Sequence, residues 1–223
     1  MVGACNRLGV DVMTGHWEFT YRDEEVLENI GAFDGEFVAQ NVRVSEEAMF
    51  DGAEAFDEDS GHAFRPYTIR ELGDRRVAVI GQAFPYTPIA NPSRFIPDWS
   101  FGIRDADLQD LVDEIREQEK PDAVVLLSHN GMDVDLKLAS IVRGLDAILG
   151  GHTHDGMPVA SVVENPAGRT IVTNAGSNGK FLAVLDLDLA EGRVRDFRYT
   201  LLPVFANLLP ADEAMAKFIA EVR

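Results

Sequence analysis

Cysteine, basic residues and long apolar runs are all scarce in this chain of 223 residues. The single cysteine, Cys5, excludes an internal disulfide. Only 20 Lys and Arg oppose 38 Asp and Glu, so the net charge is −18 and the surface repels nucleic acid and anionic membranes. No apolar stretch is long enough for a transmembrane helix, and Met1–Leu8 lacks the pattern of a signal peptide. We therefore expect neither nucleic-acid binding nor membrane insertion.

The hydrophobic pattern predicts an α/β chain in which strands and helices alternate. Continuous apolar runs at Ala123–Leu127 and Ala147–Leu149 are typical of strands buried on both faces. Further strands are expected over Val10–Met13, Glu36–Val42, Tyr67–Leu72, Arg75–Gln82 and, in a second sheet with a turn at Glu191-Gly192, over Thr170–Asn174, Phe181–Leu189 and Arg193–Leu201. Helices are expected over Asp23–Ile30, Asp105–Gln118 with Asp105 as N-cap, Asp133–Arg143 closed by Gly144, and Ala211–Val222. The segment Ala83–Phe101 is expected to be an ordered loop.

Two glycine-containing loops follow the two buried strands and hold three of the five histidines. Their sequences are Ser128-His129-Asn130-Gly131 and Gly150-Gly151-His152-Thr153-His154. Loops at the carboxyl ends of parallel strands converge on one crevice, and an extended His-x-His places both rings on one side. Because neutral imidazole binds Mn, Fe and Zn, we predict His129, His152 and His154 to be metal ligands. The alternative is that they are turn histidines bonded to backbone carbonyls.

These loops, followed by Asn174-Ala175-Gly176-Ser177, resemble the second half of the catalytic domain in 5′-nucleotidase and calcineurin-like metallophosphoesterases. The resemblance implies a β-sandwich flanked by helices, in four α/β/β/α layers, incomplete at its N-terminal side. It implies a pair of divalent metal ions bound by the three matching histidines. Residues 1–205 would be the C-terminal part of the catalytic domain, and residues 206–223 the start of a helix that leads to a further domain.

A second motif departs from the common pattern of that superfamily. Its members carry Gly-Asn-His-Glu, in which the Asn binds metal and the His assists catalysis. The present chain has Thr14-Gly15-His16-Trp17-Glu18, so His16 matches the catalytic histidine and Gly15 replaces the Asn ligand. The superfamily's early Asp-x-His and Gly-Asp ligand motifs have no counterpart here either. We therefore expect the isolated chain to bind metal weakly and to turn over slowly.

The departure itself resembles a subfamily, the SoxB thiosulfohydrolases of bacterial sulfur oxidation. The matching segments are Gly9–Tyr21, Ile80–Pro92, Ser128–Lys137 and Leu201–Pro210. This resemblance implies a periplasmic enzyme with two Mn ions, for which Zn, Fe and Mg are alternatives. Its substrate would be an anionic thiosulfonate on a cysteine of the carrier SoxYZ, from which it releases sulfate. His16 would donate a proton or stabilise the transition state.

Several residues have both a functional and a structural interpretation. Trp17 and Glu18 shape a substrate entrance or simply pack. Arg104 meets an anionic substrate or is surface, and Asn174 binds substrate or forms its turn. A structural interpretation is favoured for Arg94, Asn178, Asp133 and Asp135, and His62 is expected to be solvent-exposed. Two other functions also remain open, namely a phosphoester hydrolase of the same fold and a catalytically silent binding module.

Overall fold

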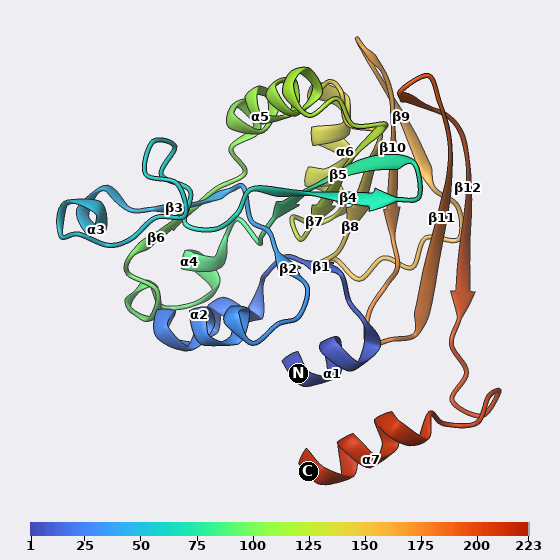
Figure 1. Ribbon diagram of the computed structural model, residues 1–223, viewed down its shortest axis with the longest axis horizontal. Coiled ribbons are helices and arrows are strands. Elements are labelled where there is room, and N and C mark those ends of the chain that lie inside the picture. Colours follow the sequence, from blue (N-terminus) through green and yellow to red (C-terminus); the bar gives the residue numbers. More distant parts are fainter. Residues whose placement is uncertain (223) are drawn as a thin grey trace.

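A six-stranded mixed sheet forms the centre of the computed structural model, which describes residues 1–222 (Figure 1). Its strands, in spatial order, are β4 (Tyr67–Leu72), β5 (Arg75–Gln82), β7 (Ala123–Ser128), β8 (Ala147–Gly150), β10 (Gly168–Asn174) and β9 (Ser161–Asn165). The four inner strands pair in parallel, while β4 and β9 pair antiparallel at the two edges. The inner strands therefore all end at the same edge of the sheet.

Two helices, α5 (Asp105–Gln118) and α6 (Met132–Ile141), pack on one face of this sheet (Figure 1). The apolar face of α5 is made of residues spaced three and four apart, among them Leu108, Val112 and Ile115, and all three are buried. They lie in one core cluster with Ile80 of β5 and Leu126 of β7. Helical periodicity thus placed α5 correctly, at the expected bounds.

A long hairpin of β11 (Phe181–Ala190) and β12 (Arg193–Pro203) covers the opposite face of the sheet (Figure 1). Side chains along β11 alternate between half-buried and exposed, as a strand with one covered face requires. Leu185 and Leu187 pack with Val125 of β7 in a second core cluster. The helix–sheet–sheet layering confirms the expected fold class.

The N-terminal part of the chain is built from short elements around an aromatic core. These are α1 (Val2–Leu8), β1 (Val12–Met13), the 3₁₀ turn η1 (Trp17–Thr20), α2 (Asp23–Gly31), β2 (Glu36–Phe37), β3 (Val42–Val44), α3 (Glu46–Phe50), α4 (Thr87–Ala90), η2 (Ser93–Phe95) and β6 (Trp99–Phe101). Strands β1 and β2 pair in parallel, and β3 and β6 pair antiparallel. Rings of Phe19, Phe37, Phe64, Trp99 and Phe101 meet at centroid distances of 4.9–6.2 Å. This core holds β1, and hence the residues that follow it, against the main sheet.

Several predicted elements need correction. Thr170–Asn174 belongs to the central sheet and not to the second one, because β10 pairs with β8. The single strand expected over 36–42 is two short strands, the loop over 83–101 contains α4, η2 and β6, and strand β9 was missed. Arg104, not Asp105, is the N-cap of α5, and α6 ends at Ile141 with Val142, not Gly144, as its C-cap.

The last helix, α7 (Glu213–Val222), lies beside α1, where the Arg7 guanidinium sits 4.5 Å from the ring centroid of Phe218 (Figure 1). The segment expected to lead to a further domain, residues 206–223, includes Arg223, which lies outside the described residues. Within residues 1–222, no helix combines the length and apolarity needed to cross a membrane.

Candidate metal centre

Three imidazoles meet at the edge of the sheet where the inner strands end. His129 follows β7 directly, and His152 follows β8 after one further glycine. The two loops are neighbours because Ser128 and Gly150, the last residues of these strands, are paired in register. His16 follows β1 and reaches the same place from the aromatic N-terminal part. Possible ligand atoms of these three histidines all lie within 4.8 Å of one another.

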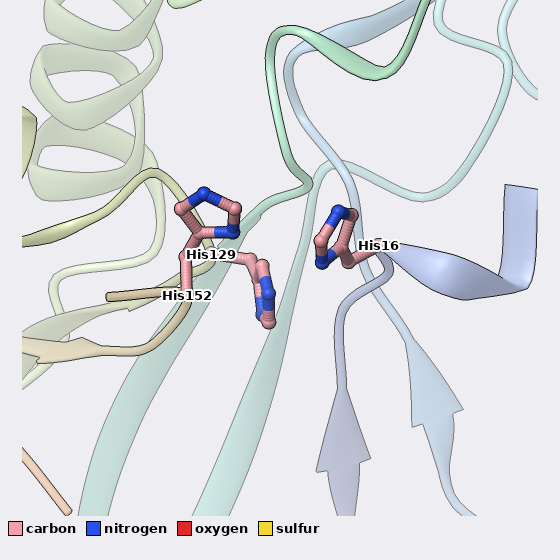
Figure 2. Close-up of side chains that lie close together, drawn as sticks. All are labelled: His16, His129 and His152. Atoms are coloured by element: carbon pink, nitrogen blue, oxygen red, sulfur yellow. The ribbon is translucent and has the colours of Figure 1, made fainter. Parts of the chain in front are cut away.

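The close-up shows His16 facing His129 and His152 from the other side of the group (Figure 2). Ring centroids are 4.7 Å apart for His16 and His129, 5.0 Å for His16 and His152, and 5.4 Å for His129 and His152. His16 was expected to act in catalysis, and the structure brings it within ligand distance of two predicted metal ligands. The assignment of roles within the group stays a prediction.

All three imidazoles are held neutral near pH 7. Burial, followed by the neighbouring imidazoles, lowers the pKa of His16 and of His129 to about 4. Burial and then His154 lower the pKa of His152. A neutral imidazole keeps a lone pair for a metal, and three such donors match a catalytic site that leaves positions open for water and substrate. The side chains present therefore fit one divalent cation.

His154 lies outside this group of three. The expectation of an extended His-x-His segment is wrong, because His152 and His154 have φ values of 68° and 60°. The Thr153 N–H donates to the Gly151 carbonyl across this tight turn, and His154 is exposed. His154 is still near enough to lower the pKa values of the other three imidazoles. Its role as a ligand remains a prediction.

Gly15 stands where a larger residue would crowd the aromatic core. A Cβ atom at this position would lie 2.7 Å from Cε2 of Phe19 and 3.0 Å from Cζ of Phe37. Both rings belong to the buried aromatic core, so they cannot move aside freely. The aromatic core thus disfavours a side chain at the position where the common superfamily motif has Asn.

An aromatic wall adjoins the histidines. Trp17 is 61% exposed and stacks on His16 at 4.6 Å between ring centroids. Phe84, which the sequence did not single out, stacks on His152 at 4.1 Å and also contacts His16 at 4.4 Å. Its sequence signals were its place just after the end of β5 and its inclusion in the SoxB-like segment Ile80–Pro92. The Glu18 carboxylate accepts the His16 backbone N–H at 2.6 Å, so Glu18 fixes the turn that presents His16.

Arg104 and Asn174 are tied to the protein itself. Arg104 adopts a left-handed backbone conformation with φ of 51°, and its guanidinium donates to the Asn41 carbonyl and to Ser100 Oγ. The Asn174 amide donates to the Gly151 carbonyl at 3.2 Å and accepts the Gly176 N–H at 3.0 Å. Asn174 therefore braces the loop that carries His152. That either residue touches a substrate stays a prediction.

His62 is buried, which corrects the expectation that it is exposed. Its side chain is 7% exposed, Nδ1 lies 2.6 Å from Ser60 Oγ, and Nε2 has no hydrogen-bond partner among the described residues. The turn over Asp57–His62 is closed by a bridge between these two residues, and a second bridge from His62 to Arg43 of β3 carries the imidazole inward. His62 does not belong to the group of His16, His129 and His152. Arg94 is exposed.

Solved structures similar to this chain include a SoxB and a 5′-nucleotidase. No family model matches the chain. The chain is 38% identical to the solved sulfate thiohydrolase SoxB of Thermus thermophilus, with a TM-score of 0.87, over 99% of this chain and 38% of that one. It is 26% identical to a 5′-nucleotidase precursor of Thermus thermophilus, with a TM-score of 0.82, over 99% of this chain and 44% of that one. The chain has the fold of the 5′-nucleotidase-type metallophosphoesterases.

Sequence similarity to curated proteins supports the same superfamily. The trifunctional nucleotide phosphoesterase YfkN of Bacillus subtilis is 34% identical over 151 residues, which is 66% of this chain and 10% of that protein. The chain thus spans less than half of each of these relatives. The comparisons support the 5′-nucleotidase and calcineurin-like phosphoesterase superfamily, of which SoxB is one possible member.

Proposed function

We propose that this chain forms the histidine-bearing part of a metal-dependent hydrolase of the SoxB type. The main support for this proposal is the group of three neutral imidazoles that follow β1, β7 and β8, namely those of His16, His129 and His152. As a SoxB-type enzyme it would act in the periplasm on a thiosulfonate bound to a cysteine of the carrier SoxYZ. Two Mn ions are proposed as its metals, with Zn, Fe and Mg as alternatives. The three imidazoles would hold one of them, and the second rests on the resemblance to SoxB.

Two observations support a sulfur substrate over a phosphoester. The identity to the solved SoxB, 38%, exceeds the 26% to the solved 5′-nucleotidase, although both align over 99% of the chain. In addition, Phe19 and Phe37 occupy the space beside Gly15, so an Asn of the common motif would crowd these rings. A site built without that Asn fits the variant motif that the chain shares with the SoxB subfamily.

The proposed reaction is hydrolysis at a tetrahedral, anionic sulfur. The oxygen of water bonds to the terminal sulfur, the sulfur–sulfur bond breaks, and its electron pair leaves with the sulfur that remains on the carrier. Sulfate is released and the water protons go to solvent. A bound divalent cation would supply Lewis acidity, lower the pKa of water and offset charge on the sulfonate oxygens.

The chain's own groups orient this reaction. Glu18 holds the His16 backbone, Asn174 holds the His152 loop, and Phe84 packs against both imidazoles. His16 is then placed to give or accept a hydrogen bond at the reacting group, since its ring is next to the proposed ligands. Exposed Trp17, stacked on His16, forms the wall past which a carrier-borne substrate enters.

The test is hydrolysis by the whole chain at saturating Mn²⁺. One substrate is a synthetic peptide with a cysteine-bound thiosulfonate, the other is AMP, and ion chromatography measures sulfate and phosphate. We expect sulfate release to exceed phosphate release. His152→Ala should reduce it by more than the roughly 10- to 100-fold typical of losing a group that supports a metal ligand, because a ligand itself is lost. Faster phosphate release would overturn the sulfur assignment.

A nucleotide phosphoesterase is the second candidate. The 34% identity to YfkN, a nucleotide phosphoesterase by name, favours it. It predicts that phosphate release from AMP is Mn²⁺-dependent and lost in His152→Ala. A catalytically silent binding module that docks a protein partner is the third candidate, and it predicts release of neither sulfate nor phosphate.

A further inference from the structure

Asp135 is a fully buried carboxyl group that lies beside the last residues of β7 and β8, the strands that lead to His129 and His152. It lies in the first turn of α6, and its side chain is 0% exposed. Its Oδ2 atom has no hydrogen-bond partner among the described residues. Burial raises the pKa of its carboxyl to about 6. A helix start does not require such burial, so the structural interpretation of Asp135 as a helix-starting residue is incomplete.

One oxygen of Asp135 is tied to the loop that carries His129. Ser128 Oγ donates to Asp135 Oδ1 at 2.5 Å, and the same Oγ accepts the Asn130 backbone N–H at 3.1 Å. The Asp135 backbone N–H donates to the Gly131 carbonyl at 2.9 Å. Ser128 and Asn130, which flank His129, are therefore both held by hydrogen bonds that lead to the Asp135 carboxyl.

The other oxygen of Asp135 lies against the strand that leads to His152. A Cβ atom on Gly150 would lie 2.4 Å from Asp135 Oδ2 and 3.1 Å from the Thr173 carbonyl. The glycine at the end of β8 is thus the residue that lets the carboxyl approach this backbone. Ser128 and Gly150 are partners in the β7–β8 ladder, so a single carboxyl group touches both members of this last pair.

We propose that Asp135 is a positioning residue that fixes the ends of β7 and β8 relative to each other, and so sets the separation of the His129 and His152 imidazoles. The inference deepens the proposed function, since it concerns how the same metal site is held. It assigns Asp135 no contact with metal or substrate. A carboxyl buried at 0% exposure costs free energy, and this cost is tolerated where it orders a functional site.

The experiment compares Asp135→Ala and Asp135→Asn with a matched control, Thr170→Val. Thr170 is also fully buried, and its hydroxyl donates to the Leu145 carbonyl and accepts the Asn165 amide N–H, on the part of β10 away from the histidines. Mn²⁺ affinity is measured by the electron paramagnetic resonance signal of the free ion. We expect Asp135→Ala to weaken binding by about 10- to 100-fold, as loss of a group supporting metal ligands does. Asp135→Asn keeps an acceptor for Ser128 and should stay near wild type, as should Thr170→Val.

A second readout does not depend on metal binding. In metal-free protein, the ¹H–¹⁵N signals of the His129 and His152 rings report whether each imidazole has one environment. Asp135→Ala should shift or broaden both signals. Thr170→Val should leave both signals unchanged, even where it lowers the thermal stability as much as Asp135→Ala does. Unchanged ring signals in Asp135→Ala, or equal effects of both variants, would overturn the positioning role. If wild-type protein binds no Mn²⁺, the proposed function fails and these signals still decide on Asp135.

Discussion

At the scale of single residues, His62 shows how burial sets a charge state. Burial, followed by the nearby Arg43, lowers the pKa of His62 to about 4, while an unfolded histidine titrates near 6.5. Between these values the unfolded chain binds a proton that the folded chain does not. The free energy of unfolding therefore falls as pH drops from about 6.5 to about 4, and it is unaffected by His62 above that window.

This linkage gives a test in His62→Gln, which cannot titrate in that range. Between pH 7 and pH 5 we expect wild type to lose about 2 kcal/mol more stability than the variant, from a shift of this size. Urea denaturation at both pH values measures the difference. The raised pKa of Asp135 has the opposite effect, because it increases the stability of the folded state as pH falls. Wild type and His62→Gln both contain Asp135, so its effect cancels in the comparison. Equal losses in the two proteins would contradict the burial of His62.

Gly15 is the residue at which close packing bears most directly on the site. Gly15→Ala places a methyl group against Phe19 and Phe37, and we expect it to destabilise the fold by about 1–3 kcal/mol through overpacking. The control is Gly31→Ala, because a Cβ there meets nothing within 4 Å. Thermal unfolding of both variants measures the difference. If Gly15→Ala melts no lower than Gly31→Ala, the aromatic core does not exclude a side chain at position 15.

At the scale of elements, local signals predicted α5 and the β11–β12 hairpin well. The apolar positions of α5 follow a helical spacing, and Glu191-Gly192 matches the pair of positive φ values, 56° and 70°, at the hairpin turn. Short strands such as β2 and β3 were not separated, because two- and three-residue strands have too little alternation to recognise.

The hairpin turn can be tested in isolation from the site. Gly192→Val forces a β-branched residue to a φ of 70°, so we expect a loss of about 1–2 kcal/mol in stability. Thr200→Val is the control, since it places the same side chain at an exposed position of β12 with extended backbone. The midpoints of urea denaturation report the effect. An unchanged midpoint for Gly192→Val would mean that the turn has another conformation.

At the scale of the whole molecule, the candidate centre joins segments that are far apart in the sequence. His16 comes from the N-terminal part, whereas His129 and His152 come from the central sheet. A cation bound among them therefore links the two parts of the molecule and should stabilise both against unfolding. Ligands that bind only the folded state raise its stability by mass action.

We expect Mn²⁺ at about 100 times its dissociation constant to raise the free energy of unfolding by about 2.7 kcal/mol. Because the net charge is −18, any divalent cation also screens the surface, and Ca²⁺ at the same concentration is the control. His152→Ala should keep the shared effect of screening and lose the part specific to Mn²⁺. Differential scanning calorimetry measures both. Equal stabilisation by Mn²⁺ and Ca²⁺ would count against a histidine site.

Sequence alone determined the α/β class, the two buried strands β7 and β8, and the histidine loops that follow them. These features depend on apolar runs, helical spacing and glycine signals, all of which are local. The tertiary structure decided three further features: the burial of Asp135 and His62, the sheet to which β10 belongs, and which histidines form the group. His16 enters that group because the aromatic core docks β1 beside the sheet, and His154 leaves it because its backbone turns left-handed. Contacts between distant segments and departures from regular backbone have no periodic signature in the sequence, so only the folded chain shows them.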